Sequence, residues 1–262
     1  MDFDISPILA KWKHTPGEVT VRCITGSDGR AKIQMRLDLG LLQMEKEGQP
    51  DGRRPYGCTS LLEYHWGRLA RYKQVNGVEI GFELSDKQCK ALREEAVMYY
   101  YRYLSLLILG QYDQVVQDTE RNLQAFDLCR KFAARKADRV ALEQYRPYVL
   151  MMNSRARAQL AIEQDKLDDA LDICRQGINS ITKFFKQMSR PELADRCSEL
   201  AILRTLCEDI QRKLPPDPVD TLHADLAKAL EGEQYEEAAK LRDELRNLNI
   251  PNSTFPKKKS DL

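Results

Sequence analysis

A small group of arginines in the first part of the chain could bind an anion. Arg36 lies in a segment where polar and apolar residues alternate, and Arg53 and Arg54 follow in a loop rich in Gly, Pro and Asp. A guanidinium group presents paired N–H donors that match the oxygens of phosphate and carboxylate groups. The three arginines form a candidate anion site; the alternative is that they lie on a solvent-exposed sheet face.

Known catalytic and nucleotide-binding motifs are missing around these arginines. The chain has no Walker A sequence, no G-x-G-x-x-G after a strand, no H-E-x-x-H and no G-x-S-x-G. Its three histidines, His14, His65 and His223, match no zinc-ligand spacing, and its seven cysteines include no C-x-x-C pair. The sequence predicts a protein that is not an enzyme and that has no cofactor and no bound metal.

Four tyrosines lie within five residues, at Tyr99, Tyr100, Tyr101 and Tyr103. Such a group could stack on the bases of single-stranded nucleic acid. Consecutive residues point around a helix, however, which favours packing between helices with the hydroxyl groups in water.

The composition is that of a folded protein without a general attraction for polyanions. Hydrophobic residues make up 42% of the chain and charged residues 31%, and the formal net charge is +1. A nearly neutral chain is not drawn to nucleic acid or to an anionic membrane by charge alone. No run approaches the ~18 apolar residues of a membrane span, and the acidic N-terminus is not a secretory signal. These features predict a cytoplasmic protein that does not enter a membrane.

Residues 1–84 are predicted to form a small module with a β-hairpin. Apolar and polar residues alternate from Val19 to Cys23 and again from Ala31 to Leu39, and the intervening GSDGR has turn-forming residues. A lone hairpin is only marginally stable in water, so its apolar face must cover another part of the molecule. A helix over 60–72 and an extended segment over 75–85 are expected next.

Residues 85–213 show a helical period, so the predicted fold class is mainly α. Ser85 and Gln88 match a capping box at the start of this body. Helices are expected over 86–110, from 112, over 142–164, over 167–188 and over 190–214.

Two stretches of this body, 101–123 and 154–178, resemble one another. In the second, small and bulky residues are placed as in a tetratricopeptide helix pair: Ala158, Ala161, Leu167, Ala170 and Ile178. In the first, Val115 and Val116 stand where that repeat usually has alanine. A tetratricopeptide-like body and a plain antiparallel helical bundle are therefore both open.

A proline-rich linker is predicted over 214–220, because several prolines cannot continue a helix and favour an extended spacer. Residues 221–250 then predict two amphipathic helices joined by a turn at Gly232, a C-terminal helical hairpin. Residues 251–262 form a basic tail with three consecutive lysines.

The second helix of this hairpin carries the sequence YEEAAKLRDEL, from Tyr235 to Leu245. It resembles the UVR motif of bacterial excision-nuclease subunits B and C and of some proteins associated with Clp ATPases, with Tyr235 in place of the more usual Phe. The resemblance covers about thirty of the 262 residues. It implies a helical hairpin that pairs with another such hairpin or with a cognate domain. The rest of the chain is similar to bacterial proteins of uncharacterised function that end in this motif.

The motif and the apolar stripes together assign a set of docking residues: Leu226, Leu230, Tyr235, Ala238, Ala239, Leu241, Arg242, Asp243 and Leu245. A hairpin of about thirty residues is below the ~40 residues that usually fold alone. Its outer face must therefore bury against its own helical body or a second chain, and the proline linker favours a second chain. Arg242 and Asp243 are either a specific contact or a solvated surface pair.

The expected function is that of a non-enzymatic adaptor. Its hairpin would dock an excision-repair subunit, a Clp-type chaperone or a second copy of itself in a homodimer. The alternative is a nucleic-acid-binding accessory factor in DNA repair, which would use Arg36, Arg53 and Arg54 together with the lysines of the tail.

Overall fold

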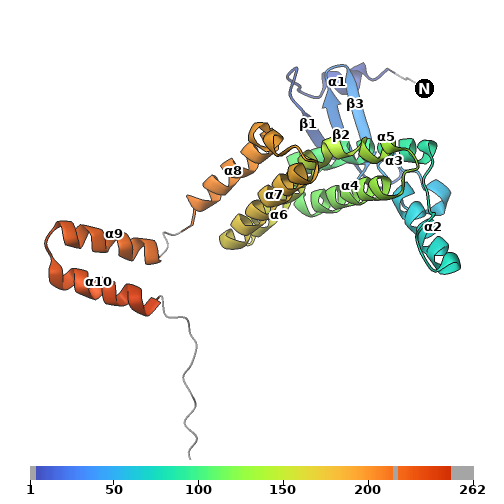
Figure 1. Ribbon diagram of the computed structural model, residues 1–262. Coiled ribbons are helices and arrows are strands. Elements are labelled where there is room, and N and C mark those ends of the chain that lie inside the picture. Colours follow the sequence, from blue (N-terminus) through green and yellow to red (C-terminus); the bar gives the residue numbers. More distant parts are fainter. Residues whose placement is uncertain (1–3, 215–217, 249–262) are drawn as a thin grey trace, which may run out of the picture. The chain divides into compact units, whose positions relative to one another are not determined.

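The computed structural model describes residues 4–214 and 218–248, and the chain divides into two compact units, one ending at Gln211 and one starting at Arg212. The described part is mainly helical with one small antiparallel sheet near its N-terminus (Figure 1). The predicted mainly α class is confirmed.

The sheet has three strands in the order β1 (Thr20–Thr25), β2 (Ala31–Leu37) and β3 (Gly40–Glu45), all antiparallel. A short helix, α1 (Ser6–Ala10), precedes them. The predicted hairpin is β1 and β2, and its turn places Gly29 at a φ of 75°, which glycine adopts without strain. The third strand was missed because GLLQME has two adjacent leucines and so lacks a clean period of two.

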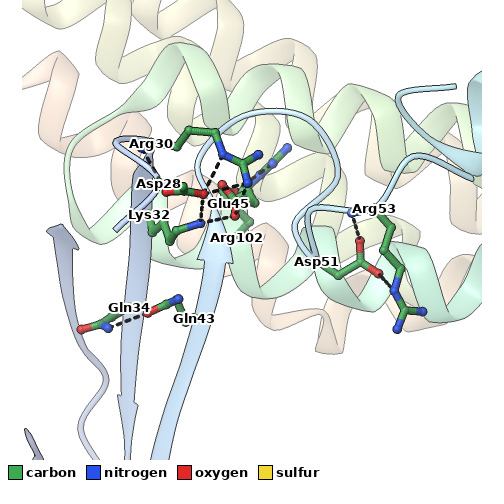
Figure 2. A network of polar contacts seen from close by, with 9 residues as sticks. All are labelled: Asp28, Arg30, Lys32, Gln34, Gln43, Glu45, Asp51, Arg53 and Arg102. Carbon is green, nitrogen blue, oxygen red and sulfur yellow. Dashed lines mark hydrogen bonds and ion pairs between the residues drawn. The ribbon is translucent and has the colours of Figure 1, made fainter. Parts of the chain in front are cut away.

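The central strand, β2, is covered on both faces. Ile33 and Met35 lie in the hydrophobic core, while Gln34 and Arg36 on the opposite face are only 6% and 8% exposed. Gln34 forms hydrogen bonds to both neighbouring strands. Arg22 Nε donates to Gln34 Oε1 at 2.7 Å. Gln34 Nε2 donates to Gln43 Oε1 at 2.8 Å, the contact that Figure 2 shows. The alternative that this face of β2 is exposed to solvent is therefore wrong for Gln34 and Arg36.

Six long helices follow the sheet in the first unit: α2 (Leu61–Asn76), α3 (Asp86–Ile108), α4 (Tyr112–Phe132), α6 (Arg146–Glu163), α7 (Leu167–Gln187) and α8 (Ser198–Gln211). Each of α3, α4, α6 and α7 packs against the next long helix along the chain. The predicted capping box is present, with the Ser85 and Gln88 side chains satisfying each other's backbone N–H groups.

Two parts of the helical body differ from the sequence prediction. The segment over 75–85 is not a strand, because α2 continues to Asn76 and ends on Gly77 in the left-handed conformation. Within it, Leu84 forms an isolated backbone bridge to Ala133. The helix expected over 190–214 is a 3-10 helix, η3 (Pro191–Arg196), followed by α8, because Cys197 between them is extended.

The connection from α4 to α6 also has more structure than the sequence suggested. It contains the short helix α5 (Lys136–Val140) and the 3-10 helix η2 (Glu143–Tyr145), so the helix expected from 142 begins at Arg146. Pro147 lies in its first turn, where a missing N–H costs nothing.

Helices α6 and α7 approach each other closely at Gly177. A methyl group on Gly177 would lie 2.3 Å from Ser154 Oγ, 2.8 Å from Ser154 Cβ and 3.1 Å from Leu203 Cδ1. The first two distances are shorter than any normal contact, so α7 packs this closely on α6 only because position 177 has no side chain.

We expect Gly177→Ala to lower the free energy of unfolding of the first unit. Overpacking typically costs about 1–3 kcal/mol, which outweighs the ~1 kcal/mol that alanine gains over glycine inside a helix. Gly67→Ala in α2 is the matched control, since nothing lies within 4 Å of its added methyl group, and it should raise stability. The free energy of unfolding of both variants is measured by urea titration with tryptophan fluorescence as the signal. Equal effects of the two substitutions would contradict the close approach of α6 and α7.

The second unit contains α9 (Pro218–Glu231) and α10 (Tyr235–Leu248), which lie side by side (Figure 1). Between them Gln234 N donates to Ala229 O at 2.8 Å, and Glu233 has a φ of 55°. Helix α9 begins inside the range predicted as linker, because proline is well tolerated in the first turn of a helix. The remaining linker residues 215–217 and the basic tail over 251–262 lie outside the described residues.

Candidate functional sites

The predicted docking residues lie on α9 and α10 and differ widely in exposure. Ala238 and Leu245 are buried together with Ala229, and so form the contact between the two helices. Leu226 and Leu241 are half-buried, and Ala239, Arg242 and Asp243 are exposed. Leu230 and Tyr235 are 53% and 67% exposed. The described contact between the helices therefore uses small side chains and one leucine, and leaves two large apolar side chains in water.

Leu230 and Tyr235 lie on either side of the turn between the helices. Leu230 is in the last turn of α9, and Tyr235 is the first residue of α10. Tyrosine combines a large apolar ring with a hydroxyl that can stay hydrated, which is why it is common where a surface meets a partner. The turn end of this unit therefore presents an apolar contact point within the described residues.

Arg242 and Asp243 are neighbours on α10 and form a surface ion pair. Arg242 Nη2 lies 3.1 Å from Asp243 Oδ1, and the side chains are 68% and 61% exposed. An exposed pair of this kind contributes only ~0–1 kcal/mol, so a partner could separate the two charges at little cost.

The three arginines of the candidate anion site do not converge on one face. Arg36 Nη1 donates to the carbonyl oxygens of Leu37 and Gly40, the latter at 2.9 Å, so its charge is used at the turn between β2 and β3. Arg53 and Arg54 instead line a cavity of about 450 Å³, together with Arg30, Glu45, Glu47 and Gln49. A second cavity, of about 370 Å³, also lies against Gln49, Arg53 and Arg54.

A buried ion pair holds the loop that forms this cavity. Arg102 of α3 donates from Nε and Nη2 to the two carboxylate oxygens of Asp118 in α4, at 2.8 and 2.6 Å. Its Nη1 donates to Gly48 O at 2.6 Å and to Glu45 O at 3.2 Å. One guanidinium therefore joins two helices, β3 and the following loop; Figure 2 shows Arg102 beside Glu45. Burial raises the pKa of Asp118, and the hydrogen bonds from Arg102 oppose that shift.

Sequence reasoning missed this pair. Arg102 lies among the tyrosines of YYYRYL, and Asp118 is sixteen positions away in the next helix. The available signal was that both polar residues fall on the apolar stripe of a predicted helix, where an unpaired charge would be costly.

Other charges beside the cavity neutralise one another. Lys32 Nζ contacts Glu45 and lies 3.0 Å from Asp28 Oδ2, and Arg30 Nη2 lies 2.8 Å from the same Asp28 oxygen (Figure 2). The Lys32 ammonium, followed by the Arg30 N–H groups, holds the pKa of Asp28 well below its usual range.

The tyrosine group is mostly part of the core. Tyr99 and Tyr103 are 5% and 1% exposed, and burial raises the pKa of Tyr99 to about 12. A base could not reach those two rings, so the packing alternative applies to them.

No group of three or more His, Cys, Asp or Glu residues that could hold a metal ion occurs in the described ranges 4–214 and 218–248. Within the same part of the chain, no helix combines the length and apolar character needed to cross a bilayer. Comparisons with protein-family models, curated proteins and solved structures gave no match to this chain.

Proposed function

We propose that the chain is a non-enzymatic adaptor whose C-terminal helical pair docks a protein partner. The observation that carries the proposal is the exposure of Leu230 and Tyr235 at the turn end of the second unit, at 53% and 67%. Large apolar side chains presented together with tyrosine are typical of the centre of a protein interface.

The small contact between α9 and α10 supports the same proposal. Its buried residues are Ala229, Ala238 and Leu245, and fully burying a leucine-sized side chain contributes only roughly 1.5–3 kcal/mol. Ordering each residue of a helix costs roughly 1–2 kcal/mol of backbone entropy. Burial of the exposed apolar side chains against a partner would supply stability that the contact between α9 and α10 does not.

The partner we propose is a helical surface with the same character: an excision-repair subunit, a Clp-type chaperone, or the corresponding helices of a second copy. The resemblance of Tyr235–Leu245 to the UVR motif favours this class, because such motifs pair with one another or with a cognate domain. The exposed Arg242–Asp243 pair would add a polar contact at the edge of the interface.

For the first unit we propose a tetratricopeptide-like arrangement. Ala158 of α6 and Ala170 of α7 are fully buried, and Gly177 allows a close approach of these two helices. Small residues at the contact are what lets the two helices of such a repeat pack tightly.

The adaptor proposal predicts that the double variant Leu230→Ser, Tyr235→Ser in the full chain loses its partner. Removing a hot-spot contact from the centre of an interface costs about 2 kcal/mol or more, which lowers the affinity about 30-fold or more. Sedimentation of the purified chain measures self-association, and titration with purified excision-nuclease subunits B and C and with a Clp ATPase measures the other pairings.

Val75→Ser is the matched control, because Val75 is 82% exposed on α2 in the first unit, and it should bind as the unchanged chain does. Circular dichroism verifies that the helices of the double variant are retained. If the unchanged chain neither self-associates nor binds any of these proteins, or if the double variant binds equally well, the proposal is wrong.

A further inference from the structure

The cavity lined by Arg53 and Arg54 has charged groups and a buried polar atom that the described residues leave without partners. It occupies about 450 Å³ between the end of β3, the loop over 46–54 and the residues around Thr59. Small-molecule sites in proteins typically fall between about 300 and 1,000 Å³. Its walls include backbone at Gly48 and Gly52, both with positive φ, so part of the lining is main chain.

Most of the charged groups in the cavity wall are already paired. Arg30 contacts Asp28 and Glu45, and Glu45 is also bound by Lys32. Arg53 lies against Asp51, with 3.7 Å between Nε and Oδ2 and a backbone hydrogen bond of 2.9 Å (Figure 2). These groups cancel and provide little net attraction for a ligand.

Two lining charges are left. The Arg54 guanidinium makes no hydrogen bond and no ion pair within the described residues, and it acts only through space on Glu63, which Thr59 already binds through two 2.6 Å hydrogen bonds. Glu47 likewise makes no hydrogen bond or ion pair in that part of the chain. Among the described residues that line the cavity, Arg54 and Glu47 therefore leave one positive and one negative charge for a ligand.

A third group points to a ligand independently of these charges. Gln49 lines the cavity and is only 6% exposed, and its buried Oε1 accepts no hydrogen bond from any described residue. A buried carbonyl without a donor costs ~1–3 kcal/mol, so this atom favours a ligand with an N–H group.

We propose that this cavity binds a small zwitterion, a free α-amino acid. Its carboxylate would accept hydrogen bonds from Arg54, and its ammonium would donate to Gln49 Oε1 and face Glu47. A simple anion matches the site less well, because it would meet the Glu47 carboxylate and leave Gln49 Oε1 without a donor.

The site is held in place before a ligand arrives. Arg102 binds Gly48 O, and Glu45 N donates to Pro50 O at 2.8 Å, so the loop is held on both sides of Gln49. A preorganised loop loses little conformational entropy on binding, which favours affinity for a ligand as small as an amino acid.

The test measures the thermal midpoint of the full chain with each standard L-amino acid separately, and with inorganic phosphate and acetate as anions without an ammonium group. At least one amino acid should raise the midpoint, and calorimetry gives its affinity. Arg54→Gln and Glu47→Gln remove one charge each at exposed positions, and each should weaken that affinity about tenfold to a hundredfold. Arg204→Gln, an exposed arginine on α8, is the control and should change nothing.

Failure of every amino acid to raise the midpoint would overturn the proposal, as would equal binding of phosphate or acetate. Unchanged affinity in both Arg54→Gln and Glu47→Gln would also overturn it. The result is independent of the adaptor function, because the variants lie in the first unit and the docking residues in the second.

Discussion

Replacing Asp118 with Asn is expected to destabilise the first unit by about 3–5 kcal/mol, the cost of leaving a buried charge without its counterion. Arg102 and Asp118 side chains are only 6% and 7% exposed, so water cannot solvate the guanidinium once the carboxylate is gone. Asparagine has nearly the same shape, so the loss would reflect charge rather than packing. Typical domains have only ~5–15 kcal/mol of stability in total.

Tryptophan fluorescence during urea unfolding measures this loss selectively, because both tryptophans, Trp12 and Trp66, lie in the first unit. Asp172→Asn is the control: Asp172 is 68% exposed and pairs with Arg175 on the surface of α7, so its replacement should change stability by less than about 0.5 kcal/mol. A similar small change for Asp118→Asn would mean that the buried pair contributes nothing to the fold.

The stability of the first unit should also fall steeply as the pH drops from 6.5 to about 4, through His65. This imidazole is 2% exposed, and burial, with a smaller contribution from Arg68, lowers its pKa from 6.5 to about 4. Arg68 Nη1 lies 3.2 Å from His65 Nδ1, a geometry in which the neutral ring accepts the hydrogen bond. In this pH range the unfolded chain binds a proton that the folded chain does not, so acid favours unfolding by up to about 3 kcal/mol.

The measurement compares urea unfolding of the unchanged chain and of His65→Gln at both ends of this pH range. Carboxylates titrate in both proteins, so the His65 contribution is the difference between their losses, and His65→Gln should lose about 3 kcal/mol less. His223→Gln, at an exposed position in the second unit, should follow the unchanged chain. Equal losses in all three proteins would rule out a buried neutral His65.

Elements governed by local sequence were the ones that could be predicted. The capping box at Ser85 and Gln88, the β1–β2 turn and the periods of α3, α4 and α7 all depend on residues within a few positions of one another. Strand β3 and the break at Cys197 were missed because tertiary packing, and not a local pattern, decides them.

The sites divide in the same way. The sequence singled out Arg53 and Arg54, but the cavity that they line also needs Glu47 and Gln49 of the same loop. Arg102, from a distant helix, holds that loop in place. No spacing rule connects those positions, and Arg36, chosen for its alternation, is used elsewhere. The docking residues and the adaptor function stay predictions that depend on the UVR resemblance and on the exposure of Leu230 and Tyr235.

The hydrogen bonds from Arg102 to the loop over 46–54 also affect how that loop can move. The Arg102 guanidinium, buried between α3 and α4, donates hydrogen bonds to the carbonyl oxygens of Glu45 and Gly48. The loop over 46–54 therefore cannot open without exposing the buried ion pair of Arg102 and Asp118 to water. The backbone amides of this loop should then exchange with deuterium as slowly as the first unit unfolds, and not at the rate of a free loop. The loop over 46–54, although it lies at the surface, would then unfold together with the helices of the first unit.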